Sequence, residues 1–420
     1  MRNTVNNHRR NFLRTGLATG AAGFLSQASA QTKPAGLSAK LGKLMNAPVL
    51  RAELLKQPVK IEKIELLKNG SEFLVVVRAT DGATGIAAAH SSTLATTYPI
   101  FVKRIAPFFV GKDAREVESL IHGVYLRDSN YKWQGLPFWV CVASLEFAVL
   151  DLLGKVAGKP MGELFGPVLR RDIPVYRASG VRGNKPEDEI EYLQKLIAET
   201  GAKAIKFRLG ARMRYDDAST KRDLTLIPLT RKTFGERMTL HADANGSYDV
   251  PMAIRIGRLM EEQRFAFLEE PAPFDYYDET KQIADALKIP IALGEQESSL
   301  RSFRRIIETK TAQVIQPDLF YFGGFSRSVK VARMAAAAGL DCTPHMSGGG
   351  LGWLYVAHFA SCVPNAGPFQ EYKGEADEFP VSSDTSSLKC EKGILKVPGG
   401  TGLGVTIDPA FIRKASVMTA

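Results

Sequence analysis

Six side chains that can bind a cation or move a proton recur at nearly constant spacing in the second half of the chain. They are separated by 26, 26, 23, 27 and 26 residues, and they are Asp243, Glu269, Glu295, Asp318, His345 and Glu371. Most of them close an apolar, strand-like run, such as FAFLE or LDCTPH. One strand–helix unit of a β/α barrel takes roughly 30 residues, and barrel enzymes carry their chemistry at the C-terminal ends of the strands. The spacing therefore predicts that all six side chains lie on one rim of a barrel.

The first three of these residues are carboxylates. Asp243 ends the run TLHAD, Glu269 lies in FLEEPAP and Glu295 lies in ALGEQES. Three carboxylates leave about half of an octahedral shell for water and substrate oxygens, the arrangement that Mg²⁺ prefers, and all-oxygen ligation argues against zinc. We therefore predict a Mg²⁺ site, with Mn²⁺ as a substitute. Because side chains alternate along a strand, only one of the adjacent Glu269 and Glu270 is expected to point inward.

Two cations precede the carboxylates, in the run AIKFRLG. Alternation along a strand places Lys206 and Arg208 on one side and Phe207 on the other. Both cations would then point into a mouth rich in carboxylates, where they have opposite charges to meet. Asn245, two residues after Asp243, could add an amide to the same mouth.

The last three residues of the series can transfer a proton. A carboxylate such as Asp318, when bonded to one nitrogen of an imidazole, fixes the tautomer and raises the basicity of the other nitrogen. His345 on the neighbouring strand would then act as a general base near neutral pH. Glu371, one strand further, completes the ring.

The rhythm of the chain divides it into domains. Residues 58–172 begin with sheet-like runs that turn at Asp81-Gly82, a strong hairpin signal, and continue with helical periodicity over residues 98–126 and 138–155. Strand and helix patterns then alternate through residues 173–378, which predicts a parallel sheet with helices outside it. The Gly-rich tail, residues 379–420, lacks that rhythm and is expected to return to the N-terminal domain.

The N-terminus resembles a bacterial twin-arginine export signal. Arg9-Arg10-Asn11-Phe12-Leu13 precedes a mildly apolar stretch, and Ala28-Ser29-Ala30 supplies the small residues of a cleavage site. We therefore expect residues 1–30 to be a signal peptide and the mature protein to be periplasmic. Residues 31–57 are polar and interrupted by Pro, which predicts a linker.

The composition limits the classes of partner. The 420 residues are 45% hydrophobic and 24% charged, as in ordinary globular proteins. The runs of apolar residues look too short for a membrane-spanning helix, so no stable membrane insertion is expected. The formal charge is +11, but the basic residues are scattered rather than clustered, which argues against a nucleic-acid partner. A modest positive field favours anionic small molecules.

These residues together resemble the enolase superfamily, specifically its mandelate racemase subgroup, over roughly residues 58 to 410. The resemblance includes the Gly-containing segment TDGATGIAAA, the helix ending in LDLLGKVAGKPMGELFG, the K-x-basic strand, the three carboxylates, and the Q-P-D and T-P-H segments. It implies a (β/α)₇β barrel, a modified TIM barrel, capped by an α+β domain built from both ends of the chain. It also implies a homo-oligomer, since relatives often form dimers or octamers.

The resemblance further implies abstraction of a proton next to a carboxylate. It assigns the Mg²⁺ ligands to Asp243, Glu269 and Glu295, the carboxylate-binding lysine to Lys206, and the base and its partner to His345 and Asp318. Glu371 corresponds to the acidic hydrogen-bonding residue, and Asn245 to a position near the substrate. Substrate choice in the family lies in capping-domain loops, here around residues 90–98 and 129–137, with Tyr131, Trp133 and Gln134 as candidate contacts.

One departure from the family pattern bears on the reaction. Two-base enzymes carry a lysine where this chain has Arg208, and a guanidinium cannot readily accept a proton. A racemase needs bases on both faces of the substrate, whereas a dehydratase needs one. Dehydration of an aldonate or aldarate to a 2-keto-3-deoxy acid is therefore favoured, with Arg208 binding a hydroxyl or the carboxylate. A racemase or epimerase of a hydroxy acid and a non-catalytic periplasmic binding protein are the alternatives.

Overall fold

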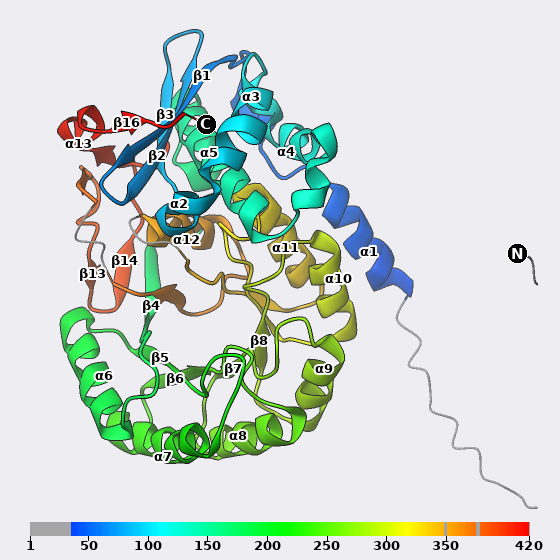
Figure 1. The fold of residues 1–420 in the computed structure, drawn as a ribbon, viewed down its shortest axis with the longest axis vertical. Coiled ribbons are helices and arrows are strands. Elements are labelled where there is room, and N and C mark those ends of the chain that lie inside the picture. Colours follow the sequence, from blue (N-terminus) through cyan, green and yellow to red (C-terminus); the bar gives the residue numbers. More distant parts are fainter. Residues whose placement is uncertain (1–34, 348–350, 375–378, 420) are drawn as a thin grey trace, which may run out of the picture.

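Eight parallel strands and seven helices alternate between Asp172 and Tyr372 and close into a barrel, as seen in a computed structural model that describes residues 35–347, 351–374 and 379–419 (Figure 1). In chain order they are β4 (Asp172–Ala178), α6 (Pro186–Thr200), β5 (Ala204–Arg208), α7 (Asp217–Phe234), β6 (Thr239–Asp243), α8 (Val250–Glu262), β7 (Phe267–Glu269), α9 (Tyr277–Ala286), β8 (Ile291–Leu293), α10 (Leu300–Thr309), β9 (Val314–Ile315), α11 (Phe325–Ala337), β10 (Asp341–Cys342), α12 (Gly352–Cys362) and β11 (Gln370–Tyr372).

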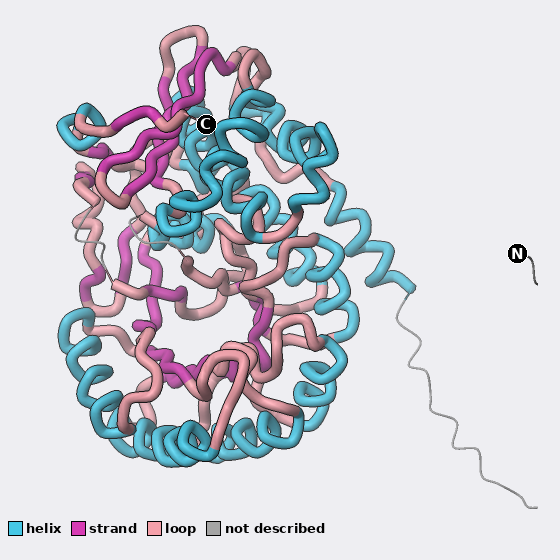
Figure 2. The backbone as a smooth tube through the Cα atoms, in the orientation of Figure 1, coloured by secondary structure: helices cyan, strands magenta, loops and turns pink. Residues whose placement is uncertain are grey.

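The strands run in the order β10-β9-β8-β7-β6-β5-β4, and β11 pairs with β4 in parallel, so that the sheet curls back on itself. A parallel bridge between Cys342 and Ala366 joins the two ends of the ring. Figure 2 shows the strands as an inner ring with the helices outside it. This is the predicted (β/α)₇β barrel.

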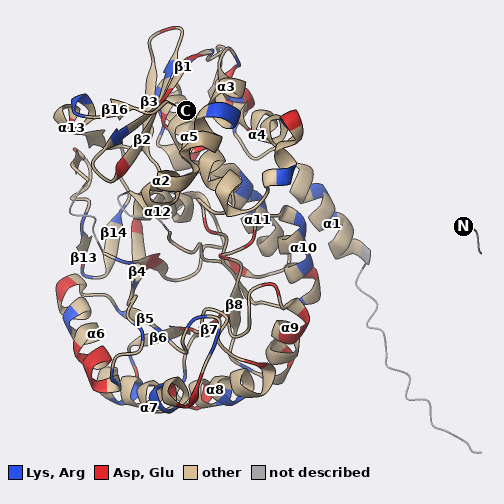
Figure 3. Ribbon diagram, viewed as in Figure 1, with Lys and Arg blue, Asp and Glu red and all other residues tan. Residues whose placement is uncertain are grey.

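Alternation along the strands sorts the side chains as expected. On β5, Phe207 packs outward into an apolar cluster with Leu226 and Ile227 of α7, whereas Lys206 and Arg208 are buried on the other side. Charged residues of both signs are interspersed along the outer helices, without a single basic band (Figure 3). Lys206 and Arg208 are thus buried cations on the inner side of β5.

The smaller domain is a sheet covered by one long helix. Strands β1 (Ile61–Asn69), β2 (Glu72–Ala79) and β3 (Thr84–Ala88) form an antiparallel meander with the predicted turn at Asp81-Gly82. Helix α5 (Leu136–Ala157) packs on β3 so closely that a Cβ added to Gly85 would lie 2.1 Å from the carbonyl oxygen of Ala148. Only glycine permits this contact.

Helix α5 also ties the cap to the barrel. The buried carboxylate of Glu146 accepts hydrogen bonds from the backbone N–H groups of Phe325 and Ser326 and from the Ser326 hydroxyl, at the start of α11. By length and composition this 22-residue helix could cross a membrane, so the expectation that the apolar runs are too short is wrong for this segment. However, 89% of its most apolar window is buried inside the protein.

The helical periodicity over residues 98–126 does not form one helix. The segment is divided into α2 (Ser91–Ile100), a π-helical turn (Phe101–Ile105), α3 (Ala106–Phe109) and α4 (Val117–Leu126). Pro107, near the start of α3, lacks an N–H group and so interrupts the preceding hydrogen-bond ladder. The helical run itself ends after Phe109, where Val110 is extended and Gly111 has φ of +78°, so the break that the periodicity does not predict lies at this glycine turn.

The predicted linker over residues 31–57 is wrong from Ala35 onward. Residues Ala35–Asn46 form helix α1, which packs against α10 and α11. Leu41 and Met45, four residues apart on one helical face, are buried there. This burial anchors a segment whose polar composition suggested a free connection. The predicted signal peptide, residues 1–30, lies outside the described residues.

The tail serves both domains. β14 (Ile394–Lys396) pairs antiparallel with β4 of the barrel and with β13 (Cys390–Glu391). β12 (Val381–Ser382) and β15 (Thr406–Ile407) form a separate pair. After α13 (Pro409–Arg413), β16 (Ser416–Val417) joins β1 in the cap sheet. Gly402 and Leu403 also hydrogen-bond to the cap, at Lys159, Met161 and Asp151. The tail therefore contacts the barrel first and returns to the cap from about Gly402 onward.

Candidate active site

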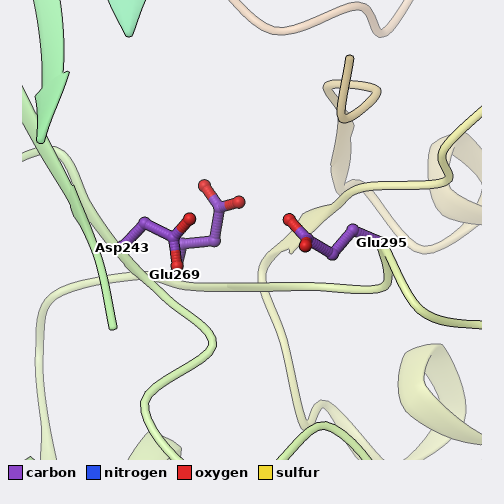
Figure 4. Close-up of side chains that lie close together, drawn as sticks. All are labelled: Asp243, Glu269 and Glu295. Carbon is purple, nitrogen blue, oxygen red and sulfur yellow. The ribbon is translucent and has the colours of Figure 1, made fainter. Parts of the chain in front are cut away.

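Three carboxylates meet at the ends of adjacent barrel strands. Asp243 and Glu269 are the last residues of β6 and β7 and are paired in register. Glu295 comes two residues after the end of β8. All three are buried, and one potential ligand oxygen from each lies within 4.8 Å of those of the other two. Figure 4 shows Asp243 and Glu269 facing Glu295 across a small gap.

The three carboxylates have the properties of a cation site. One buried oxygen of each, Asp243 Oδ2, Glu269 Oε1 and Glu295 Oε2, accepts no hydrogen bond from the described residues, although Asp243 Oδ2 forms an ion pair with Arg208 and Glu295 Oε2 lies 3.3 Å from His345 Nε2. Burial raises the pKa of Glu295, and repulsion from Glu269 adds to this effect. Clustered buried carboxylates are unfavourable unless cations compensate their charge. The all-oxygen donor set fits Mg²⁺.

Lys206 lies beneath this cluster as a fully buried cation. Its Nζ atom is 2.8 Å from Glu269 Oε2 and 2.9 Å from Glu371 Oε1. Burial alone would lower the pKa of Lys206, but the charges of these two carboxylates outweigh burial and raise it. Lys206 is therefore held in its protonated form.

Arg208 is engaged by the cluster rather than free to act on a substrate proton. Its guanidinium forms an ion pair with Asp243 and donates hydrogen bonds to Asn245 Oδ1 at 3.3 Å and to the Ser179 carbonyl at 3.2 Å. The backbone pairing of Arg208 with Asp243 across β5 and β6 sets this contact. Arg208 thus supports a predicted metal ligand.

His345 and Asp318 form a hydrogen-bonded pair on the other side of the mouth. His345 Nδ1 lies 2.7 Å from Asp318 Oδ2, and His345 Nε2 lies 3.3 Å from Glu295 Oε2. With the Nδ1 proton donated to Asp318, the Nε2 lone pair is left toward the carboxylates. The predicted base, its partner and the predicted metal ligands therefore belong to one constellation.

A pocket of about 580 Å³ opens above this constellation. The barrel contributes His345, Glu295 and Asn245 to its lining, and the cap contributes His90 and Ser92. The space can therefore hold a small molecule between the two domains, in contact with His345, Glu295 and Glu270.

Comparison with known proteins agrees with this geometry. Residues 48–166 match the mandelate racemase / muconate lactonizing enzyme N-terminal domain, and residues 188–411 match the enolase C-terminal domain-like family. The chain belongs to the mandelate racemase / muconate lactonizing enzyme family of the enolase superfamily. Enzymes of this superfamily use Mg²⁺, and the triad of Asp243, Glu269 and Glu295 has an arrangement that could hold a metal ion.

Several proteins of this family are similar over most of their length. An arabinonate dehydratase of Saccharolobus solfataricus is 26% identical over 79% of this chain and 87% of its own. A D-galactonate dehydratase of Ralstonia nicotianae is 29% identical over 77% of this chain and 85% of its own. The crystal structure of a mandelate racemase/muconate lactonizing protein from Paracoccus denitrificans, complexed with magnesium, has a TM-score of 0.77 at 24% identity, covering 86% of this chain and 99% of that one.

Lys373 is a site residue that the sequence reasoning missed. Its Nζ atom lies 3.2 Å from His345 Nε2 and 3.8 Å from Glu371 Oε1, and it donates a hydrogen bond to the carbonyl of Met346. Lys373 could have been predicted, because it follows Glu371 by two residues and alternation places the two side chains on the same side of the chain. The strand–helix spacing identified only Glu371.

The expectation that only one of the adjacent glutamates points inward is also wrong. Glu270 has φ of +41°, which turns the chain at the end of β7 and breaks the alternation. Its buried side chain lines the pocket and accepts a hydrogen bond from Asn245 Nδ2 at 3.2 Å. Burial raises the pKa of Glu270, with repulsion from Glu295 and Glu269 adding to it.

The capping-loop contacts were predicted in part. Residues 90–98 do reach the pocket, through His90 and Ser92. Tyr131, Trp133 and Gln134 do not line it, and Trp133 instead stacks on Arg104, with 5.1 Å between the guanidinium carbon and the ring centroid. Tyr131 and Trp133 remain partly exposed on the surface of the cap.

Proposed function

We propose that this chain is a Mg²⁺-dependent dehydratase of sugar acids, which converts an aldonate or aldarate into a 2-keto-3-deoxy acid and water. The observation that carries the proposal is the His345–Asp318 pair beside three clustered carboxylates in a pocket of the enolase superfamily. The dehydratase names of the two relatives support the same reaction class.

The residues divide the reaction between them. His345 Nε2 would take the proton α to the substrate carboxylate, and the electron pair would move toward the carboxylate oxygens. Lys206, held protonated between Glu269 and Glu371, would stabilise the negative charge that develops there. When bound, Mg²⁺, or Mn²⁺ as a substitute, supplies further positive charge beside the same carboxylate.

The β-hydroxyl must then leave with a proton. His345 carries the proton it has just taken, and Lys373 lies 3.2 Å from the same nitrogen. Either group could protonate the departing oxygen, with loss of one water and formation of an enol that tautomerises to the 2-keto acid. Both groups lie on one side of the pocket, as dehydration through a single face requires.

Racemisation fits the site less well. It needs a second base on the opposite face, where the chain has Arg208, and this guanidinium is occupied by Asp243, Asn245 and Ser179. A binding protein without turnover is disfavoured because the base, its partner and the acidic cluster are all in place.

A screen of acid sugars tests the proposal directly. Purified protein with Mg²⁺ should form 2-keto products, detected with semicarbazide, from at least one aldonate or aldarate. Inversion of a hydroxy acid at its α carbon, without a keto product, would replace the dehydratase with the racemase.

We also propose that the chain is exported through the twin-arginine pathway and works in the periplasm as a homo-oligomer. Arg9, Arg10 and the Ala28-Ser29-Ala30 site support the export. Replacing both arginines by lysine should leave the protein in the cytoplasmic fraction of a bacterial host, and light scattering of the mature protein measures its assembly. Unchanged export of that double variant would remove the proposal.

A further inference from the structure

The loop after β5 has an unusual backbone. Gly210, Arg212 and Met213 have φ angles of +59°, +55° and +59°. This left-handed region is unfavourable for residues that carry a Cβ atom, and such residues gather at functional sites where the surroundings enforce them. Here the Met213 N–H donates to the Asn245 carbonyl at 3.0 Å, and the Ala211 N–H donates to the Arg214 carbonyl at 2.9 Å. The fold thus holds this loop in a set shape.

The loop directs Arg212 to the active-site pocket. Arg212 lines the same cavity as Glu295 and His345, and its side chain is exposed. Within the described ranges it forms no hydrogen bond and no ion pair. Arg208 and Lys373, the other cations that line the cavity, are within ion-pair distance of Asp243 and Glu371.

A second guanidinium group, that of Arg182, lies near Arg212 and also has no carboxylate partner among the described residues. Arg182 donates hydrogen bonds to the Asn245 side chain and to the Leu209 carbonyl, but it forms no ion pair in the described part of the chain. Burial lowers the pKa of Arg182 to about 10, and repulsion from Arg208 and Arg212 adds to this effect. The guanidinium groups of Arg182, Arg208 and Arg212 therefore lie near one another on this side of the mouth.

The other cations of the rim have carboxylate partners. Lys206 pairs with Glu269 and Glu371, and Arg208 pairs with Asp243. Lys373 Nζ lies 3.8 Å from Glu371 Oε1. Among the described residues, Arg182 and Arg212 have no such partner, and of these two only Arg212 lines the pocket.

We propose that Arg212 binds a second carboxylate, at the end of the substrate remote from the reacting one, so that the enzyme selects dicarboxylic sugar acids (aldarates) over aldonates. This inference rests on the proposed function and narrows its substrate class. A guanidinium matches a carboxylate in geometry and binds it through two parallel hydrogen bonds. An aldonate offers a neutral hydroxyl at that position.

Binding calorimetry with matched acids tests the inference. The probes are galactarate against galactonate and glucarate against gluconate, pairs that differ only in the oxidation of the terminal carbon. They are titrated with Mg²⁺ into His345→Asn protein, which does not turn them over, and are compared with steady-state kinetics of the active enzyme. In each background Arg212→Gln removes the charge, Arg212→Lys keeps it, and Arg214→Gln is a control on the same exposed loop.

We expect at least one aldarate to bind more tightly than its aldonate. Arg212→Gln should weaken aldarate binding by about ten- to hundredfold, the range for a hydrogen-bonded charge, and aldonate binding by less than about threefold. Arg212→Lys should retain most of the preference, and Arg214→Gln should retain all of it.

The two proposals fail in different ways. If aldonates bind and react as well as aldarates, or if Arg212→Gln weakens both classes equally, Arg212 does not select a second carboxylate and the dehydratase stands. If neither class binds or reacts although Mg²⁺ binds, both the inference and the sugar-acid dehydratase are wrong. Circular dichroism shows whether Arg212→Gln is folded. If it is not, the aldarate preference of Arg212→Lys and of the wild type decides whether Arg212 selects a second carboxylate.

Discussion

His345 Nδ1 lies 2.7 Å from Asp318 Oδ2, and the same two residues are joined by a parallel backbone bridge between neighbouring barrel strands. The other oxygen of Asp318 accepts hydrogen bonds from the N–H groups of Phe320 and Tyr321, each at 2.8 Å, and from the Ser347 hydroxyl at 2.7 Å. The imidazole of His345 is therefore oriented by a carboxylate whose own position is fixed by three hydrogen bonds. Its tautomer is set before any substrate arrives.

The first prediction concerns this pair. Asp318→Asn should fold but lower kcat by about 10²–10⁴-fold, because the neutral amide no longer fixes the Nδ1 proton or stabilises the protonated imidazole. Exchange of the substrate α proton in D₂O should fall in parallel. Ser347→Ala, which removes only one hydrogen bond to Asp318, is the matched control and should cost about tenfold or less. Near-normal exchange in Asp318→Asn would show that another group is the base.

Lys373 should act after the base. If Lys373 rather than His345 protonates the departing hydroxyl, Lys373→Met should slow dehydration by about 10²-fold or more while His345 continues to exchange the α proton. Unchanged dehydration would assign the protonation of the hydroxyl to His345. The measurement is the ratio of deuterium incorporated into recovered substrate to keto product formed. Lys389→Met, at an exposed position of the tail, should leave this ratio unchanged. Equal losses of exchange and dehydration in Lys373→Met would instead assign Lys373 to substrate binding.

Arg208 decides between one base and two. Arg208→Lys places an amine where two-base relatives have one, so slow inversion at the α carbon should appear, while dehydration weakens as the contacts to Asp243 and Asn245 are lost. Chiral chromatography of recovered substrate measures the inversion. Arg208→Gln offers no base and should show none. Inversion by the wild-type enzyme would contradict the single-face mechanism.

Removal of divalent ions should abolish activity, and Mg²⁺ or Mn²⁺ should restore it. Glu295→Gln should weaken Mg²⁺ binding by more than about tenfold in calorimetry, since a charged ligand oxygen is lost. Glu297→Gln is the matched control. Glu297 lies two residues after Glu295, but its carboxylate accepts a hydrogen bond from the Tyr277 hydroxyl and is not a predicted metal ligand. Full turnover in excess chelator would be incompatible with the metal assignment.

Glu146 gives a pH prediction for stability. Burial raises the pKa of Glu146 from 4.5 to about 7, so the folded protein binds a proton that the unfolded chain has released between these values. Its contribution to the free energy of unfolding is fully present below pH 4.5 and is lost as pH rises through 7, a change of up to roughly 3 kcal/mol.

Urea denaturation between pH 5 and 8 checks this prediction. Glu146→Gln should lose that part of the pH dependence, because the amide imitates the protonated acid at every pH. Glu262→Gln, at an exposed position, should follow the wild type. Parallel curves for Glu146→Gln and the wild type would mean that Glu146 stays charged as the cap of α11.

The regular part of the chain was predictable because a barrel repeats. The spacing from Asp243 to Glu371 reflects one strand and one helix per unit, and it found the rim residues without any contact information. Features outside the repeat were harder to predict. The position of Arg212 at the pocket depends on left-handed backbone angles, which are usually predicted only where the sequence has glycine. The inward position of Glu270 depends on a turn that breaks the alternation along β7. Helix α1 could have been found from Leu41 and Met45, whose spacing of four was obscured by polar neighbours.

The pocket takes its floor from barrel strands but part of its wall from His90 and Ser92 of the cap. The wall of the pocket is therefore encoded in two stretches of the chain, the cap residues near residue 90 and the barrel loop that carries Arg212, and both are separate from His345 and Asp318. Substitutions in either stretch are expected to change which acid is bound while leaving the base and its partner in place. A gene copy could in this way be adapted to a new acid in few mutational steps.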